Sequence, residues 1–171
     1  MKKVFVFMMA TVVALGLASC SKMEDPARPI EISDSDERSA VIEGNLVYIT
    51  DVSVAPADQK YTAAANVEIV AVISYADILA PAKPAGNWMK KITTDAAGKF
   101  VLNVPANPAG VKVHFHVSEV RGEQKQPGDK TFKGKWKFTI DDQSVVSGQR
   151  LILEQKVGAF TRIKENDDKV S

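Results

Sequence analysis

The chain has 171 residues, of which 45% are hydrophobic and 25% charged, and its 22 basic and 21 acidic residues give a formal net charge of +1. This balance argues against a nucleic-acid-binding protein, for which a basic stripe is expected. The single cysteine, Cys20, excludes an intrachain disulfide, so the hydrophobic core alone must stabilise the fold. The length suits one domain with its own core.

The chain opens with a segment typical of a lipoprotein signal peptide. Two lysines precede an apolar run over residues 4–17, and the sequence Leu-Ala-Ser-Cys ends at Cys20. The run is too short for a spanning helix, which needs about 20 apolar residues, and it predicts a secretory signal over residues 1–19. Leu-Ala-Ser-Cys also resembles the bacterial lipobox, which implies that Cys20 is lipidated and anchors the mature chain to a membrane. The alternative is plain secretion with a free Cys20, although a lone thiol is unusual in an oxidising compartment.

Residues 20–39 are predicted to be the lipidated cysteine followed by an acidic, flexible tether. Six acidic residues stand against three basic ones between residues 21 and 38, and two prolines stiffen the first half. Lys22 shortly before Glu24-Asp25 resembles the surface-export signal of Bacteroidetes lipoproteins, with Met23 inserted in the usual order. The resemblance implies an outer-membrane lipoprotein facing the cell exterior. The alternative is an ordinary acidic linker on a protein facing the periplasm.

Residues 40–160 alternate between strand signals and turn signals. No amphipathic helix is evident, and this pattern predicts an all-β fold, a single seven-stranded Greek-key β-sandwich. The tail over 161–171 is of mixed charge and is expected to fray. The expected strands are 41–50, 66–75, the two arms of a hairpin, 111–120, 132–140 and 150–157, separated by loops that include 51–65, 76–86 and 121–130.

The predicted hairpin surrounds a turn at Asp95–Gly98. Asp95 can accept hydrogen bonds from the backbone two residues on, and Gly98 can adopt a positive φ without a Cβ clash. Pro105 cannot donate to a ladder, so the second arm should end there. The residues expected to share one face are Trp88, Lys90 and Ile92 in the first arm, and Phe100, Leu102 and Val104 in the second.

Three stretches resemble the carboxypeptidase regulatory-like, prealbumin-type (transthyretin-type) domain. They are Gly44 in the first strand, Asn66-Val67-Glu68-Ile69 in the second, and the run from Thr94-Asp95 through Gly98-Lys99-Phe100 to Val104-Pro105. The resemblance covers about residues 41–158. It implies the seven-stranded Greek-key sandwich and an accessory, adhesive or spacer role rather than a particular activity.

Enzymes with related β-sandwich folds indicate which residues catalysis would need in this chain. His114-Phe115-His116 resembles the His-x-His strand of the intradiol ring-cleavage dioxygenases, and two histidines at i and i+2 could reach one metal. That family also needs two tyrosines. Tyr75 lies near the place of the first, and the 105–110 turn contains none for the second. We therefore expect no enzyme, cofactor or metal, with His114 and His116 on a solvated face. An intradiol-dioxygenase-like metal enzyme using both histidines is the alternative.

The loop 76–87 is the predicted recognition element. It concentrates Ile78, Leu79, Pro81 and Pro84 between two strands, and prolines lower the entropy lost on immobilisation. The predicted function is a non-catalytic binding module for a glycan, a peptide or an envelope partner. A structural or spacer subunit of an envelope assembly is the alternative.

A row of lysines provides a second candidate binding surface. Lys133, Lys135 and Lys137 alternate with core residues, and this pattern is typical of a solvated face that discourages edge-to-edge pairing. If this strand lay beside residues 111–118, Lys112 and the two histidines would extend the same basic face. Such a face could contact an anionic polysaccharide or lipid headgroups. Trp88 and Trp136 are expected in the core rather than on a ligand platform.

Cys20→Ser should move the protein from the membrane fraction to the soluble fraction, because the substitution removes the only residue that can be acylated by this pathway. Cell fractionation followed by immunoblotting measures the distribution. Ser21→Ala is the matched control and should remain at the membrane. Membrane attachment of the Cys20→Ser variant would contradict the lipid anchor.

Overall fold

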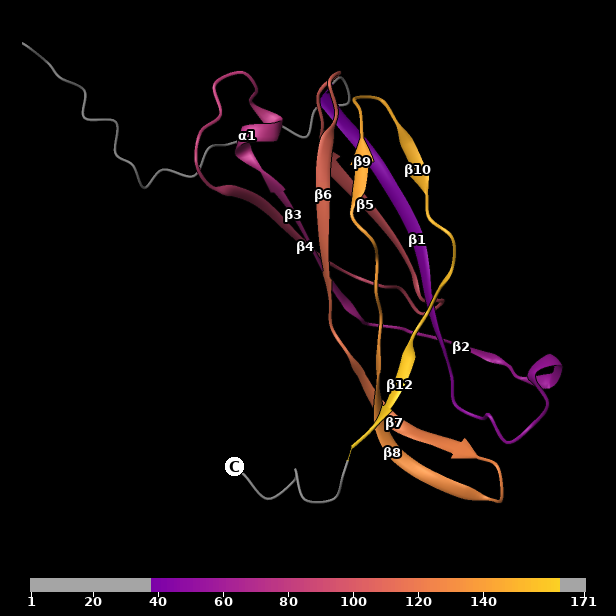
Figure 1. Cartoon of the computed structure of the whole chain (residues 1–171). Helices are drawn as coiled ribbons and strands as arrows, with labels where there is room; N and C mark the ends of the chain where they lie inside the picture. Colours follow the sequence, from indigo (N-terminus) through magenta and orange to yellow (C-terminus); the bar gives the residue numbers. More distant parts are fainter. Residues whose placement is uncertain (1–37, 164–171) are drawn as a thin grey trace, which may run out of the picture. The chain divides into compact units, whose positions relative to one another are not determined.

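The computed structural model describes residues 38–163, and this range is mostly β-structure (Figure 1). It contains twelve strands, one four-residue helix and one short 3-10 turn, η2 (Pro56–Asp58). The prediction of an all-β fold is therefore confirmed. The predicted signal peptide, Cys20 and the tether up to residue 37 lie outside the described residues, as do residues 164–171.

Strand β1 (Ser39–Ile49) is the centre of the first sheet. Along one edge it pairs antiparallel with β5 (Lys99–Pro105) and then with β2 (Tyr61–Ala63). Along the other edge it pairs parallel with β10 (Arg150–Ile152) and then with β11 (Lys156–Val157). Figure 1 shows β1 running between β5 and β10. The strand is thus hydrogen-bonded along both edges.

The second sheet has the order β4-β3-β6-β9, and all its pairs are antiparallel. Alternate residues of β3 are fully buried, while the residues between them are half-buried on the opposite face. This arrangement explains the apolar residues on both faces of β3, because one face meets the core and the other remains partly open. The four strands are β3 (Glu68–Ser74), β4 (Asn87–Thr93), β6 (Val111–Val117) and β9 (Gln143–Val145).

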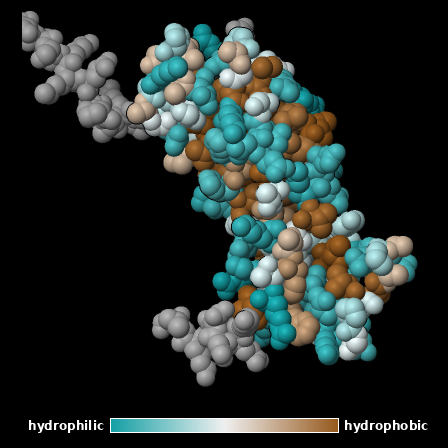
Figure 2. All heavy atoms as spheres, in the orientation of Figure 1, coloured by the Kyte–Doolittle hydropathy of each residue, from teal (hydrophilic) through white to brown (hydrophobic). Residues whose placement is uncertain are grey.

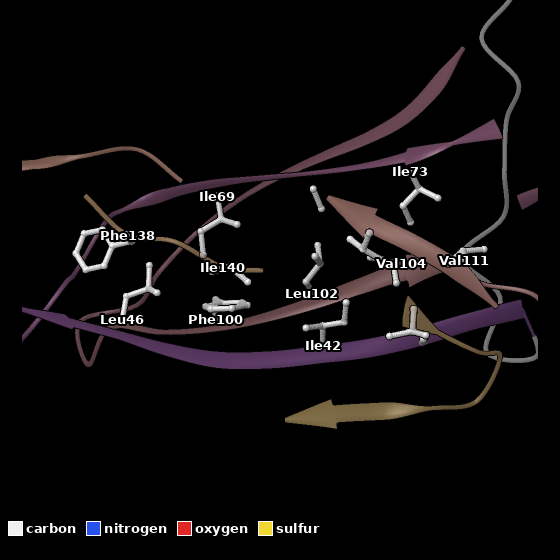
Figure 3. Close-up of a cluster of buried hydrophobic side chains, with 14 of the residues drawn as sticks. Ile42, Leu46, Ile69, Ile73, Phe100, Leu102, Val104, Val111, Phe138 and Ile140 are labelled. Atoms are coloured by element: carbon white, nitrogen blue, oxygen red, sulfur yellow. The ribbon is translucent and has the colours of Figure 1, made fainter. Parts of the chain in front are cut away.

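The core lies between these two sheets. Side chains of β1 and β5 point toward those of β3 in Figure 3, and Ile42, Ile69 and Leu102 are fully buried. The predicted inward face of the second arm is confirmed, since Phe100, Leu102 and Val104 are all buried. The first arm contributes less, because Trp88 and Ile92 are only partly buried against the same cluster.

Gly44 of β1 and Phe100 of β5 approach each other closely. The two residues are register partners, and a Cβ built on Gly44 would lie 2.6 Å from Cζ of Phe100. A real Cβ cannot come that close to a ring carbon, so the ring occupies the space that the glycine leaves. Glycine within a strand often marks such an approach.

A third sheet has the order β12-β8-β7, with β7 (Val120–Gln126), β8 (Lys130–Lys137) and β12 (Ala159–Arg162). The Trp136 side chain is 1% exposed, and its ring centroid lies 4.6 Å from that of Tyr48 and 5.1 Å from that of Phe160. Trp136 is therefore a core residue, as predicted. Backbone hydrogen bonds between residues 50–52 and Lys125 attach this sheet to the chain that follows β1.

The predicted hairpin is wrong. Strand β4 pairs with β3, and β5 pairs with β1, so the two arms belong to different sheets. The turn itself is as expected: Oδ1 of Asp95 accepts from the backbone N of Ala97 and Lys99, and Gly98 has a φ of +75°. The two strands lie on opposite sides of one core, and the turn between them forms an arch, a connection that crosses from one sheet to the other. Period-2 alternation cannot distinguish such an arch from a hairpin.

Buried Thr94 fixes the crossing between the sheets. Its Oγ1 accepts from the backbone N of Val67 at 2.9 Å and donates to the carbonyl of Ala64 at 2.5 Å. Four residues further on, at Gly98, the carbonyl accepts from the backbone N of Leu46. The arch is thereby bonded to the second sheet at one end and to β1 at the other.

Several strand boundaries also differ from the prediction. The expected loop 121–130 contains most of β7, whose sequence is too polar to show alternation. The expected loop 51–65 contains β2, and the expected strand 150–157 is divided into β10 and β11. Residues 161 and 162 belong to β12 instead of a frayed tail, and β9 was not predicted. Strands of two to four residues carry too little pattern to be recognised.

Gly44→Ala should lower the free energy of unfolding by about 1–3 kcal/mol, since the methyl group meets the Phe100 ring. Phe100→Ala should cost about 3–5 kcal/mol through lost burial and a cavity. In the Phe100→Ala background, Gly44→Ala should cost much less, because the ring is gone. Urea denaturation of the four proteins measures this coupling.

Exposed Val101, the neighbour of Phe100, supplies the control. Val101→Ala should change the free energy of unfolding by at most about 0.5 kcal/mol. Additive costs of Gly44→Ala and Phe100→Ala would show that the ring does not pack on the glycine.

Candidate binding surfaces

The loop 76–87 is closed onto the domain at its base. It begins with the one-turn helix α1 (Tyr75–Ile78), whose first turn is capped by the hydroxyl of Ser74. Nδ2 of Asn107, in the turn after β5, donates to the carbonyl of Asp77 at 2.6 Å and to that of Ile78 at 3.3 Å. No sequence signal marked Asn107, because its function depends on a contact 30 residues away.

The apolar side chains of this loop do not form an exposed tip. Ile78 is 9% exposed and belongs to the core cluster, and Leu79 packs against it. Pro81, which follows a cis peptide bond, is exposed, and Pro84 is half-buried. The sequence pattern correctly marked an apolar loop, but its isoleucine supports the fold and is not available to a partner.

The outer face of the second sheet presents a different set of side chains. Val72 of β3 lies directly between Met89 of β4 and His114 of β6, and in the next row Val70 lies between Lys91 and His116. Met89 is 68% exposed, and the two valines are half-buried. We call this surface the histidine face, and its members are Val70, Val72, Met89, Lys91, His114 and His116.

Asp142 closes one side of the histidine face. Its Oδ2 lies 3.0 Å from Nζ of Lys112 and 3.0 Å from Nδ1 of His114. The hydrogen bond from Lys112, followed by the contact with His114, holds the pKa of Asp142 below its usual value. Across the sheet, Lys91 pairs with Glu68 at 2.8 Å. The face therefore has apolar residues at its centre and ion pairs at its rim.

The histidine pair has the predicted position on the outward face of β6. Nδ1 of His114 is already directed at Asp142, and His116 is exposed. Within residues 38–163, no three His, Cys, Asp or Glu side chains are grouped as metal ligands would be. Tyr75, the expected first tyrosine ligand, stands at the start of α1 and partly packs against the core.

The lysine row does not extend the histidine face. Strand β8 pairs with β7 and β12, whereas β6 pairs with β3 and β9, so the condition for a continuous basic surface is not met. Figure 2 shows hydrophilic residues over much of the visible surface, interrupted by hydrophobic ones. Among the large hydrophobic side chains exposed within residues 38–163, Tyr61 is the one aromatic, at 59% exposure.

Comparison of the chain with protein-family models and with curated proteins finds no match. The described residues also include no helix with the length and hydropathy needed to cross a membrane.

Asp142→Asn should lower stability at neutral pH, because it removes the charge that Lys112 and His114 contact. The pKa of Asp142 is depressed in the folded chain, so its contribution is present above the unfolded pKa and is lost as the pH falls through the folded value. Urea midpoints of the two proteins should therefore differ at neutral pH and converge in acid.

Asp58→Asn is the control, since Asp58 is exposed and forms no ion pair within the described part of the chain. It should leave the midpoint unchanged over the same pH range. A constant difference between the wild-type protein and Asp142→Asn at every pH would contradict a charge-dependent contribution.

Proposed function

We propose that this chain is a lipid-anchored, non-catalytic binding module of the outer membrane, displayed toward the cell exterior. The anchor is Cys20, on the strength of its lipobox-like context. Seventeen residues separate Cys20 from Arg38, a length that spans at most about 60 Å when fully extended. The domain would thus remain close to the membrane and to other envelope components.

The partner proposed here is an envelope protein that docks on the histidine face. The observation that carries this proposal is the 68% exposure of Met89 beside the half-buried Val70 and Val72. Methionine is enriched in protein interfaces, and an apolar centre within a polar rim is their usual composition. The centre of this face lacks a charged side chain, while Lys91 and the two histidines border it.

A glycan is supported less well as the ligand of this face. Sugar rings are commonly bound by stacking on aromatic side chains, and both tryptophans are directed inward. Tyr61, the exposed aromatic residue, lies on β2 of the other sheet. We therefore place the protein partner before the glycan, and we keep the prealbumin-type resemblance as a proposal for the family of the domain.

Site-specific photo-crosslinking in the native host tests this proposal. A photoreactive amino acid at Met89 should give a discrete cross-linked protein, because the side chain projects into the interface. The matched control is the same residue at Ile152, which is 70% exposed but lies on β10 of the other sheet. His116→Asp should abolish the Met89 product by placing a carboxylate at the rim.

The contradicting results are equally distinct. A chain without a cross-link at Met89, or with the same product from both positions, would show that the histidine face is not the interface. A product that forms from Met89 and not from Ile152, but persists in the His116→Asp variant, would show that His116 is not part of the binding surface.

A further inference from the structure

The positive charge of the domain is concentrated on its third sheet. Residues 119–137 and 159–163, which contain β7, β8 and β12, carry seven basic and three acidic residues, a net charge of +4. The other residues of the range 38–163 carry nine basic and nine acidic residues. The whole excess of positive charge within the described range therefore belongs to this one sheet.

Five of these cations share one face, and one of them, Lys125 of β7, already pairs with Asp129. Lys133, Lys135 and Lys137 alternate along β8 with the buried or half-buried residues of the opposite face. Alternate residues of a strand are about 7 Å apart, so the three ammonium groups form a single row. Arg121 of β7 is the register partner of Lys135 on one side, and Thr161 of β12 is its partner on the other. We call Arg121, Lys133, Lys135 and Lys137 the lysine face.

Intramolecular ion pairs leave most of this charge without a partner. Lys135 contacts Glu119 at 2.8 Å, whereas Arg121, Lys133 and Lys137 form no ion pair with any described residue. In the register of β7 with β8, Glu123 lies opposite Lys133, but Arg121 lies opposite Lys135, a like-charge pair that is unfavourable for the sheet and that Glu119 offsets only on the Lys135 side. An external anion would relieve this repulsion.

The lysine face has a rigid support. On the opposite side of β8, Trp136 is buried and packs against Tyr48 and Phe160. Nε2 of Gln124 on β7 donates a hydrogen bond to the carbonyl of Ile49 at 2.7 Å, which links β7 to the end of β1. The sheet fixes the spacing of the backbone positions that carry the cations, so a ligand has to order only their side chains.

We propose that the lysine face binds a linear acidic polysaccharide whose sugars carry carboxylates. A row of cations along one strand matches a chain of carboxylates lying parallel to it, and the planar guanidinium of Arg121 suits a carboxylate. The hydroxyl of Thr161, beside Lys135, can hydrogen-bond to a sugar. A membrane surface fits less well, because none of the large exposed hydrophobic side chains lies on β7, β8 or β12, and none could insert among lipids.

This surface is separate from the histidine face, so the inference goes beyond the proposed function and does not depend on it. It also accounts for a glycan as ligand without an aromatic platform, because the affinity is electrostatic. Such binding is sensitive to salt, since exposed charges are screened over about 10 Å at 0.1 M ionic strength.

The test is fluorescence anisotropy of a labelled polygalacturonate fragment, titrated with the full-length chain in nonionic detergent. Binding should appear at low salt, vanish at high salt, and be absent with labelled dextran, a neutral polymer. The double variant Lys133→Gln/Lys137→Gln should bind about tenfold more weakly at low salt. The control Lys83→Gln/Lys99→Gln removes the same number of charges from exposed positions outside this sheet and should bind like the wild-type chain.

Three results would overturn the proposal. The first is the absence of polygalacturonate binding at low salt. The second is an equal loss of affinity in the two double variants, which would show that binding depends only on the net charge of the chain. The third is displacement of bound polygalacturonate when phosphatidylglycerol is added to the detergent micelles, which would assign the lysine face to lipid headgroups.

Discussion

The fold depends on the hydrogen bonding of β1 along both of its edges. Two antiparallel strands and two parallel ones share its backbone groups, and Leu46 alone bonds to Gly98 through its N–H and to Ala64 through its carbonyl. Its side chains Ile42 and Leu46 are fully buried. A strand that is satisfied on both edges and buried on one face permits only one register, because a shift by one residue would turn its apolar face to solvent.

This constraint also determines which surfaces remain for binding. The core between the sheets needs apolar side chains at its ends, and α1 supplies Ile78 to it. Within the loop 76–87, Ile78 therefore contributes to the core, while Pro81 remains exposed. What the fold leaves exposed are the outer sheet faces, one with Met89 at its centre and one with the lysine row. The two proposed binding surfaces, the histidine face and the lysine face, therefore lie on different sheets.

The sequence predicts the fold class and the buried face of β5 well, because strict alternation over seven residues indicates a strand with one buried face. It also predicts the Asp95–Gly98 turn, whose side-chain acceptor and positive φ are local properties. Pairing partners are not local, and the arch between β4 and β5 therefore looks like a hairpin. The polar strand β7 shows no alternation at all, since its order comes from pairing with β8.

The same distinction between local and non-local properties applies to the binding surfaces. The outward position of His114 and His116 is a property of one strand and could be predicted. Their neighbours Val72 and Met89 come from strands about 20–40 residues away in the chain, and only the register of β3 with β4 and β6 places them in one row. Thr94 and Asn107 were missed as structural residues for this reason: their hydrogen-bond partners lie at similar distances along the chain.

Hydrogen exchange of the full-length chain tests the central position of β1 most directly. Amides bonded inside a strand that is paired on both edges should exchange only on global unfolding, whereas those of the edge strand β4 open locally and exchange sooner. We predict that the amides of residues 41–47 are among the slowest in the domain, slower than those of β4. Exchange of residues 41–47 as fast as that of β4 would contradict a fold organised around β1.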